Sequence, residues 1–83
     1  MKVGDIVRAT AGKDKGKYFL LISCEGGRGE IVCGRRRKVQ RPKLKSLKHL
    51  EKIAEADLPQ PLTNNVVLKL LKPYTTQQFK EES

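Results

Sequence analysis

The strongest constraint on the fold is an apolar run at residues 18–22, which a two-glycine turn follows closely. Successive side chains of a strand point to opposite faces of a sheet, so this run is apolar on both faces. The sequence therefore predicts a central strand over residues 17–24. The turn Glu25-Gly26-Gly27-Arg28 then predicts a hairpin, with an antiparallel partner strand over residues 29–33.

Another strand signal precedes this hairpin, over residues 3–10, where Val3, Val7 and Ala9 share one face. Ile6 falls on the opposite, polar face and weakens the alternation. A turn-forming loop follows at residues 11–16, in which Gly12 and Gly16 lie four positions apart. Because glycine adopts positive φ without steric cost, these two glycines are expected to set the geometry of the loop.

The charge of the chain is large and unevenly distributed. Its 83 residues carry 18 Lys and Arg against nine Asp and Glu, a formal net charge of +9. Residues 1–50 hold fourteen of the basic side chains and four of the acidic ones, whereas residues 51–83 are close to neutral. Solubility alone does not require such clustering. The basic half therefore predicts a polyanion-binding surface, with nucleic acid as the first candidate.

The densest basic segment is residues 35–48, in which eight of fourteen residues are cations and none is acidic. Val39, Leu44, Leu47 and Leu50 recur there as apolar anchors, which a disordered basic tail would lack. We therefore expect this segment to run over the core with its cations outward. Pro42 suits an edge strand or the first residue of a strand.

Residues 51–61 contain two prolines and are interpreted as a connecting loop. A helix is predicted over residues 62–74, with Thr63 as its N-cap and Leu62 packed against Val67. One apolar stripe at helical spacing is formed by Val67, Leu70, Leu71 and Tyr74.

Pro73 predicts that this helix ends near Lys72, because the residue before a proline disfavours helical geometry. Residues 75–83 are expected to form a flexible tail. So short a helix must pack on another surface, and the sheet is the expected one. Docking of the stripe on a partner protein is the alternative.

The residues needed for catalysis or metal binding are scarce. Cys24, Cys33 and His49 are one ligand short of a structural zinc site. Both thiols are expected to stay free in a reducing cytosol, and a disulfide across the hairpin is the alternative. The segment Gly26-Gly27-Arg28-Gly29 lacks the Lys-Ser ending of a phosphate-binding loop. The sequence thus predicts no cofactor, no metal and no enzymatic activity.

No apolar run reaches the length that a membrane span or the apolar segment of a signal peptide requires. A cytoplasmic protein with no membrane partner is therefore expected.

The segment from Val3 to Lys17 resembles the KOW motif. That motif combines a Gly-Asp opening, a hydrophobic strand, a Gly-x-x-Lys-Gly loop and a second hydrophobic strand. Here the opening is Gly4-Asp5 and the loop is Gly12-Lys13-Asp14-Lys15-Gly16. The glycines permit a sharp turn, bring backbone N–H groups near a phosphate and leave Lys13 and Lys15 at the tip.

Two departures narrow this resemblance. Many KOW proteins have a glycine where this chain has Phe19 and a larger aliphatic residue where it has Ala9, which points away from the transcription-factor members. Residues 3–50 are more similar to the archaeal and eukaryotic large-subunit ribosomal protein of the fourteen-e type and its small bacterial relatives. The resemblance implies a mostly β fold: an SH3-like antiparallel barrel of about five strands over residues 1–50, with a short C-terminal helix.

Charge and resemblance together predict a non-catalytic protein that binds structured RNA through its phosphate backbone. Ribosomal RNA is the expected RNA, ribosomal proteins are the expected neighbours, and a monomer is expected away from the ribosome. Few aromatic residues are available to stack single-stranded bases. Two alternatives stay open: an SH3-like protein-interaction module acting in translation or transcription, and a DNA-binding protein. The predicted contacts come from the loop and the basic segment: Lys13, Lys15, Lys17, Arg35, Arg36, Arg37, Lys38, Arg41, Lys43, Lys45 and Lys48.

Overall fold

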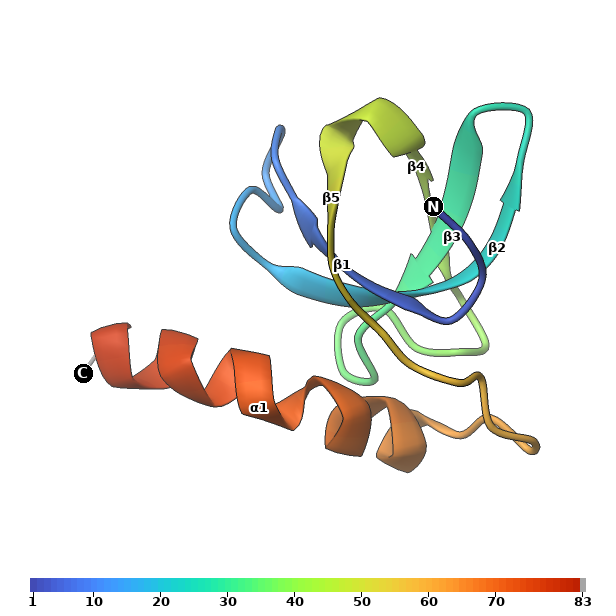
Figure 1. The fold of residues 1–83 in the computed structure, drawn as a ribbon. Helices are drawn as coiled ribbons and strands as arrows, with labels where there is room; N and C mark the ends of the chain where they lie inside the picture. The colour runs from blue at the N-terminus through green and yellow to red at the C-terminus, as the bar shows by residue number, and fades with distance from the viewer. Residues whose placement is uncertain (83) are drawn as a thin grey trace.

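The computed structural model describes residues 1–82, with side chains described through residue 75. One antiparallel sheet contains all five strands, in the order β4-β3-β2-β1-β5, and a single helix follows it (Figure 1). The strands are β1 (Asp5–Ala9), β2 (Tyr18–Glu25), β3 (Arg28–Val32), β4 (Lys43–Ser46) and β5 (Leu50–Glu55). A short 3₁₀ turn, η1 (Leu47–His49), joins β4 to β5, and the helix is α1 (Asn64–Glu82). The expected mostly β fold with a C-terminal helix is confirmed.

Strand β2 occupies the centre of the sheet, as its apolar run predicts. It pairs antiparallel with β1 on one side and with β3 on the other. Phe19, Leu20 and Leu21 are buried, with at most 2% of each residue exposed. The hairpin to β3 turns on Gly26 and Gly27, both at positive φ, which matches the twist of a tight two-residue turn.

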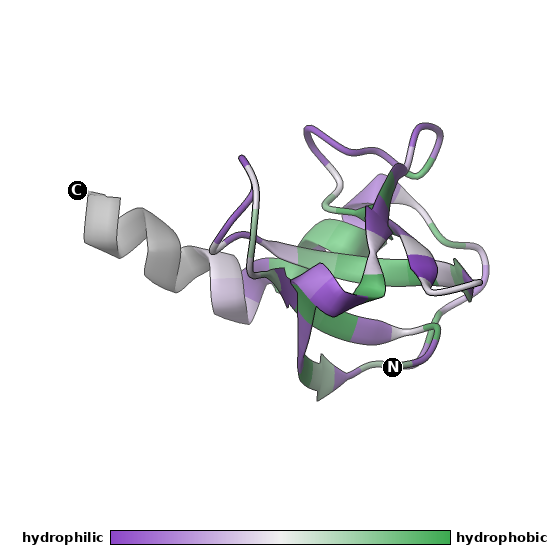
Figure 2. Ribbon diagram, turned by 90° about the horizontal axis from the view of Figure 1, so that it is seen from above, coloured by the Kyte–Doolittle hydropathy of each residue, from purple (hydrophilic) through white to green (hydrophobic). Residues whose placement is uncertain are grey.

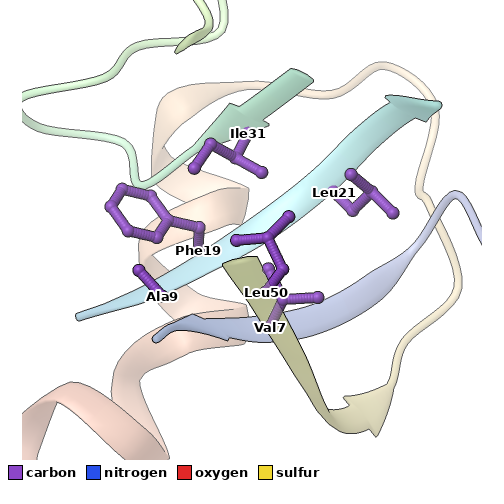
Figure 3. Packing of buried hydrophobic residues seen from close by; sticks show 6 residues of the cluster. All are labelled: Val7, Ala9, Phe19, Leu21, Ile31 and Leu50. Atoms are coloured by element: carbon purple, nitrogen blue, oxygen red, sulfur yellow. The ribbon is translucent and has the colours of Figure 1, made fainter. Parts of the chain in front are cut away.

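The sheet is strongly curved, and its concave face holds the first of two apolar clusters. That cluster contains Val7, Ala9, Phe19, Leu21, Ile31 and Leu50, which come from four strands (Figure 3). Pairing is irregular between Ile6 and Val7 in β1 and between Leu21 and Ser23 in β2. Irregularities of this kind increase local bending and twist, in keeping with the curvature of the sheet around this cluster.

The second cluster lies on the opposite face, between the sheet and α1. Ile6, Leu20 and Val32 of the sheet are buried there against Val67 and Leu71 of the helix. Hydrophobic residues accordingly concentrate in the strands, whereas the loops are mainly hydrophilic (Figure 2). The expectation that Ile6 lies on a polar face is wrong, because the helix covers that face.

The start of α1 is fixed by side-chain hydrogen bonds. Thr63 is the N-cap, as predicted: its Oγ1 accepts a hydrogen bond of 3.2 Å from the Val66 N–H. The Asn64 carboxamide accepts from the Val39 N–H at 2.8 Å and donates to Gln40 Oε1 at 2.9 Å. These bonds tie the helix to the segment that connects β3 and β4.

The sequence predicts that the helix ends near Pro73. This prediction is wrong, because the helix continues to Glu82. The two residues directly after the proline make contacts that support the helical path. The Tyr74 ring packs on Tyr18, with centroids 5.6 Å apart, and Thr75 Oγ1 donates to the Leu71 carbonyl at 3.2 Å. The flexible tail expected over residues 75–83 is therefore helical as far as residue 82, and Ser83 lies outside the described residues.

Two further expectations are wrong. Residues 51–61 do not form only a connecting loop, because β5 occupies Leu50–Glu55 and pairs with β1. Leu44 is not an apolar anchor: it lies on edge strand β4 and is 56% exposed, whereas Val39, Leu47 and Leu50 pack into the clusters.

The two cysteines are free thiols. No helix of the described residues is long and apolar enough to cross a membrane.

Replacing Leu71 with alanine tests whether α1 is part of the core. Leu71 is 1% exposed and packs on the sheet. Its truncation is expected to lower the free energy of unfolding by about 2–5 kcal/mol, as buried leucines do. Lys72→Ala, on the exposed surface of the same turn, is the control and should change stability by less than about 0.5 kcal/mol. Equal denaturant midpoints for the two variants would contradict the packing role.

Candidate nucleic-acid interface

An open groove of about 1300 Å³ lies between three segments that are distant in sequence. We call it the basic groove. Its walls are the β1–β2 loop (residues 10–17), the arginine turn (residues 34–37) that follows β3, and the middle of α1. Nine basic side chains line it: Lys13, Lys15, Lys17, Arg35, Arg36, Arg37, Lys43, Lys69 and Lys72. The groove therefore unites the two basic stretches that the sequence singles out.

The β1–β2 loop owes its shape to its two glycines, which adopt φ values of +80° at Gly12 and +87° at Gly16. Three consecutive backbone N–H groups at its end donate within the protein. The Lys15 N–H donates to the Gly12 carbonyl at 3.2 Å, the Gly16 N–H to Ala9 at 2.8 Å and the Lys17 N–H to Asp14 at 2.9 Å. The side chains of Lys13 and Lys15 are exposed on this loop, so they can reach a phosphate.

The arginine turn is a compact, closed structure. The Cys33 and Gly34 N–H groups both donate to the Arg37 carbonyl, at 2.8 and 3.1 Å, and the Arg37 N–H donates to Cys33 Sγ at 3.4 Å. Gly34 lies directly under α1: a Cβ there would come within 2.8 Å of the Asn64 carbonyl oxygen. The turn is thus held against the helix, with all three arginines exposed.

Helix α1 supplies a wall that the sequence analysis missed. Lys69 and Lys72 are exposed and line the groove, and Leu68 and Leu71 lie beside them on its apolar floor. The two lysines are three residues apart, so they share one helix face next to the apolar stripe. The spacing of these two lysines indicates a basic helix face. It was overlooked because residues 51–83 as a whole are close to neutral.

Two of the predicted contact residues, Lys43 and Lys45 of β4, are engaged with the β1–β2 loop. Lys43 forms an ion pair with Asp14, and Lys45 Nζ donates to the Ala11 carbonyl at 2.9 Å. The hydrogen bond from Lys43 lowers the pKa of Asp14 below its ordinary value, and the nearby charges of Lys43, Lys45 and Lys17 add to this effect.

Three other predicted residues lie outside the basic groove. Lys38 and Arg41 are exposed on the turn before β4, where the Arg41 N–H donates to the Lys38 carbonyl at 2.8 Å. Lys48 is exposed on η1, at the junction of β4 and β5. The structure therefore brings together seven of the eleven predicted cations around the groove. Lys45 does not line the groove but donates a hydrogen bond to the β1–β2 loop.

Two cations elsewhere on the sheet, Arg8 and Lys52, are paired with carboxylates of β5. Arg8 contacts Glu51 at 2.7 Å, and Lys52 contacts Glu55 at 2.6 Å. His49 is exposed on η1. Among the residues that the structure describes, no three His, Cys, Asp or Glu side chains are grouped so as to hold a metal ion.

No protein-family model matches this chain, and no curated protein matches its sequence.

Gly16→Val tests the geometry of the β1–β2 loop. Nothing lies within 4 Å of a Cβ built at Gly16, so the cost of the valine is the strain of its φ of +87°. We expect a loss of about 1–3 kcal/mol in the free energy of unfolding. Lys15→Ala is the neighbouring control and should leave the melting temperature unchanged. A silent Gly16→Val together with an unfolded Lys15→Ala would show that these roles are reversed.

Asp14 predicts a pH dependence of stability. Its pKa is lowered in the folded state, so the ionised carboxylate stabilises the fold above the ordinary aspartate pKa of about 4. This stabilisation is lost as pH falls through the lower, folded-state pKa. The difference in stability between the wild type and Asp14→Asn should be present at neutral pH and shrink as pH falls below the ordinary aspartate pKa. Denaturant melts across this range measure it, and a difference independent of pH would contradict the ion pair.

Proposed function

We propose that this protein is a non-catalytic RNA-binding protein that holds structured RNA by its phosphate backbone in the basic groove, on or near the ribosome. The observation that carries the proposal is the gathering of cations from three segments around one groove in which the acidic side chain, Asp14, is already paired. Arginine binds phosphate through two parallel hydrogen bonds, and lysine contributes a mobile point charge. The groove offers both.

The aromatic side chains favour backbone recognition over base stacking. Among the residues with described side chains, Phe19 is 2% exposed and the Tyr18 ring packs on Tyr74. Proteins that bind single strands usually stack bases on exposed aromatic rings. Folded or double-stranded RNA needs no such platform, because its bases are already stacked and its backbone and 2′-hydroxyl groups face the protein.

The proposal includes the fold. We infer that the curved sheet is an SH3-like barrel of the KOW group, in which Gly12 and Gly16 shape the loop and Lys13 and Lys15 lie at its tip, as the resemblance implies. The short connection η1 between edge strands β4 and β5 is compatible with such a barrel. The resemblance also favours RNA over DNA, since the phosphate contacts alone suit either polymer.

The first experiment identifies the class of partner. Protein purified at low salt is expected to carry nucleic acid. The bound nucleic acid would raise the absorbance at the nucleic-acid maximum relative to the absorbance at the protein maximum. RNase should remove this material and DNase should not. Removal by DNase alone would favour DNA binding, and nucleic-acid-free protein would favour the protein-interaction alternative.

The second experiment measures the salt dependence of RNA binding. Neutralisation of about six phosphates gives a slope of roughly −4 to −5 for log affinity against log salt concentration. Lys15→Ala and Arg36→Ala, inside the basic groove, should each weaken binding to an RNA hairpin and make the slope less steep. Lys48→Ala removes the same charge outside the groove and is the matched control. Equal effects of the three substitutions, or a slope near zero, would contradict binding in the groove.

A further inference from the structure

Asp14 is the one acidic side chain among the residues that line the basic groove. Its position is unexpected for a site that takes a polyanion, because a carboxylate repels phosphate and cancels part of the surrounding positive charge. The site would be a better electrostatic trap without it. The contacts of Asp14 indicate what it does instead.

Asp14 connects the β1–β2 loop to strand β4. Its side chain is 15% exposed and pairs with Lys43, whose side chain is 29% exposed. Two residues further along β4, Lys45 donates to the Ala11 carbonyl, so the loop is held at two points. Lys43 and Lys45 pair with Ile31 and Gly29 of β3, and their spacing places both side chains on one face of the strand.

We propose that Asp14, Lys43 and Lys45 are positioning residues: they clamp the β1–β2 loop so that Lys13 and Lys15 face the basic groove. This inference rests on the proposed function. A loop that turns on two glycines has many accessible conformations, and binding would have to select one of them. The clamp makes that selection in advance, which explains a carboxylate in a site for anions. Lys43 and Lys45 are then removed from the set of phosphate contacts.

The Asp14→Asn substitution distinguishes a carboxylate that only repels phosphate from one that clamps the loop, because the two roles change the affinity for RNA in opposite directions. This substitution keeps the shape of the side chain and removes a negative charge from the groove. A purely electrostatic role predicts tighter binding of an RNA hairpin. The clamp predicts binding weaker by roughly 3- to 10-fold, since the charged hydrogen bond that holds the loop is lost. Tighter binding by Asp14→Asn would overturn the proposal.

The salt slope provides a second, independent readout. Lys45→Met is expected to weaken binding while leaving the slope unchanged, because no phosphate contact is lost. Lys13→Met removes the same charge from the loop tip and should reduce the slope by roughly 0.7–0.9. Lys45→Arg keeps a donor for the Ala11 carbonyl and should restore affinity. A slope reduced as much by Lys45→Met as by Lys13→Met would overturn the proposal.

Hydrogen exchange tests the clamp without RNA. The Lys15, Gly16 and Lys17 amides should exchange faster in Asp14→Asn and Lys45→Met than in the wild type, under conditions where thermal melts show all three folded. The amides of the β2–β3 hairpin serve as an internal control. Unchanged loop exchange would overturn the clamp even if RNA binds. Faster loop exchange in the two variants, together with a wild-type protein that binds no RNA, would support the clamp and reject the proposed function.

Discussion

The burial of strand β2 on both of its faces is the constraint on which the rest of the structure depends. Phe19 and Leu21 enter the cluster inside the curved sheet, and Leu20 enters the cluster beneath α1. A chain of this length has room for little core, so neither face can be left open to water. On one face the curved sheet gathers side chains of four strands into a cluster, and the helix covers the other face. The curvature of the sheet and the packing of α1 are both required because the middle of β2 is apolar on both of its faces.

The same helix links stability to the candidate interface. Val67 and Leu71 face the sheet, while Lys69 and Lys72 on the adjoining side complete the basic groove. The first turn of the helix also packs on Gly34 and so fixes the arginine turn. The elements that hold the cations in place are thus the elements that complete the core. An alternative in which the apolar stripe docks a partner would have to uncover the face that Leu20 and Val32 occupy.

Local signals predicted the parts of this fold that local chemistry controls. The central strand, the two-glycine hairpin and the Thr63 cap each depend on a few neighbouring residues, and each was predicted correctly. Strand β5 was missed because its three exposed charged residues and the prolines after it are typical of a loop, while pairing with β1 is a long-range effect. The helix continues past Pro73 because Tyr74 and Thr75 make contacts beyond the proline, which no local rule includes.

The candidate site also has a part that the sequence predicts and a part that depends on the tertiary structure. Sequence identifies which residues are cations, but not which anion or carbonyl each one faces, so Lys43 and Lys45 could not be told from Lys13 and Lys15. It also could not bring Lys69 and Lys72 to the loop, since their place depends on how the helix crosses the sheet.

The arrangement of charge has an energetic consequence for the folded chain. Cations of the basic groove repel one another, and this repulsion opposes the compact state. The groove is open, so water and salt screen much of the repulsion, and buried apolar contacts of β2 and α1 outweigh what remains. Elsewhere on the sheet, Arg8 and Lys52 have carboxylate partners in Glu51 and Glu55. The one carboxylate among the groove-lining residues is paired with Lys43, so the groove keeps an excess of positive charge, which is what the proposed binding of a phosphate backbone requires.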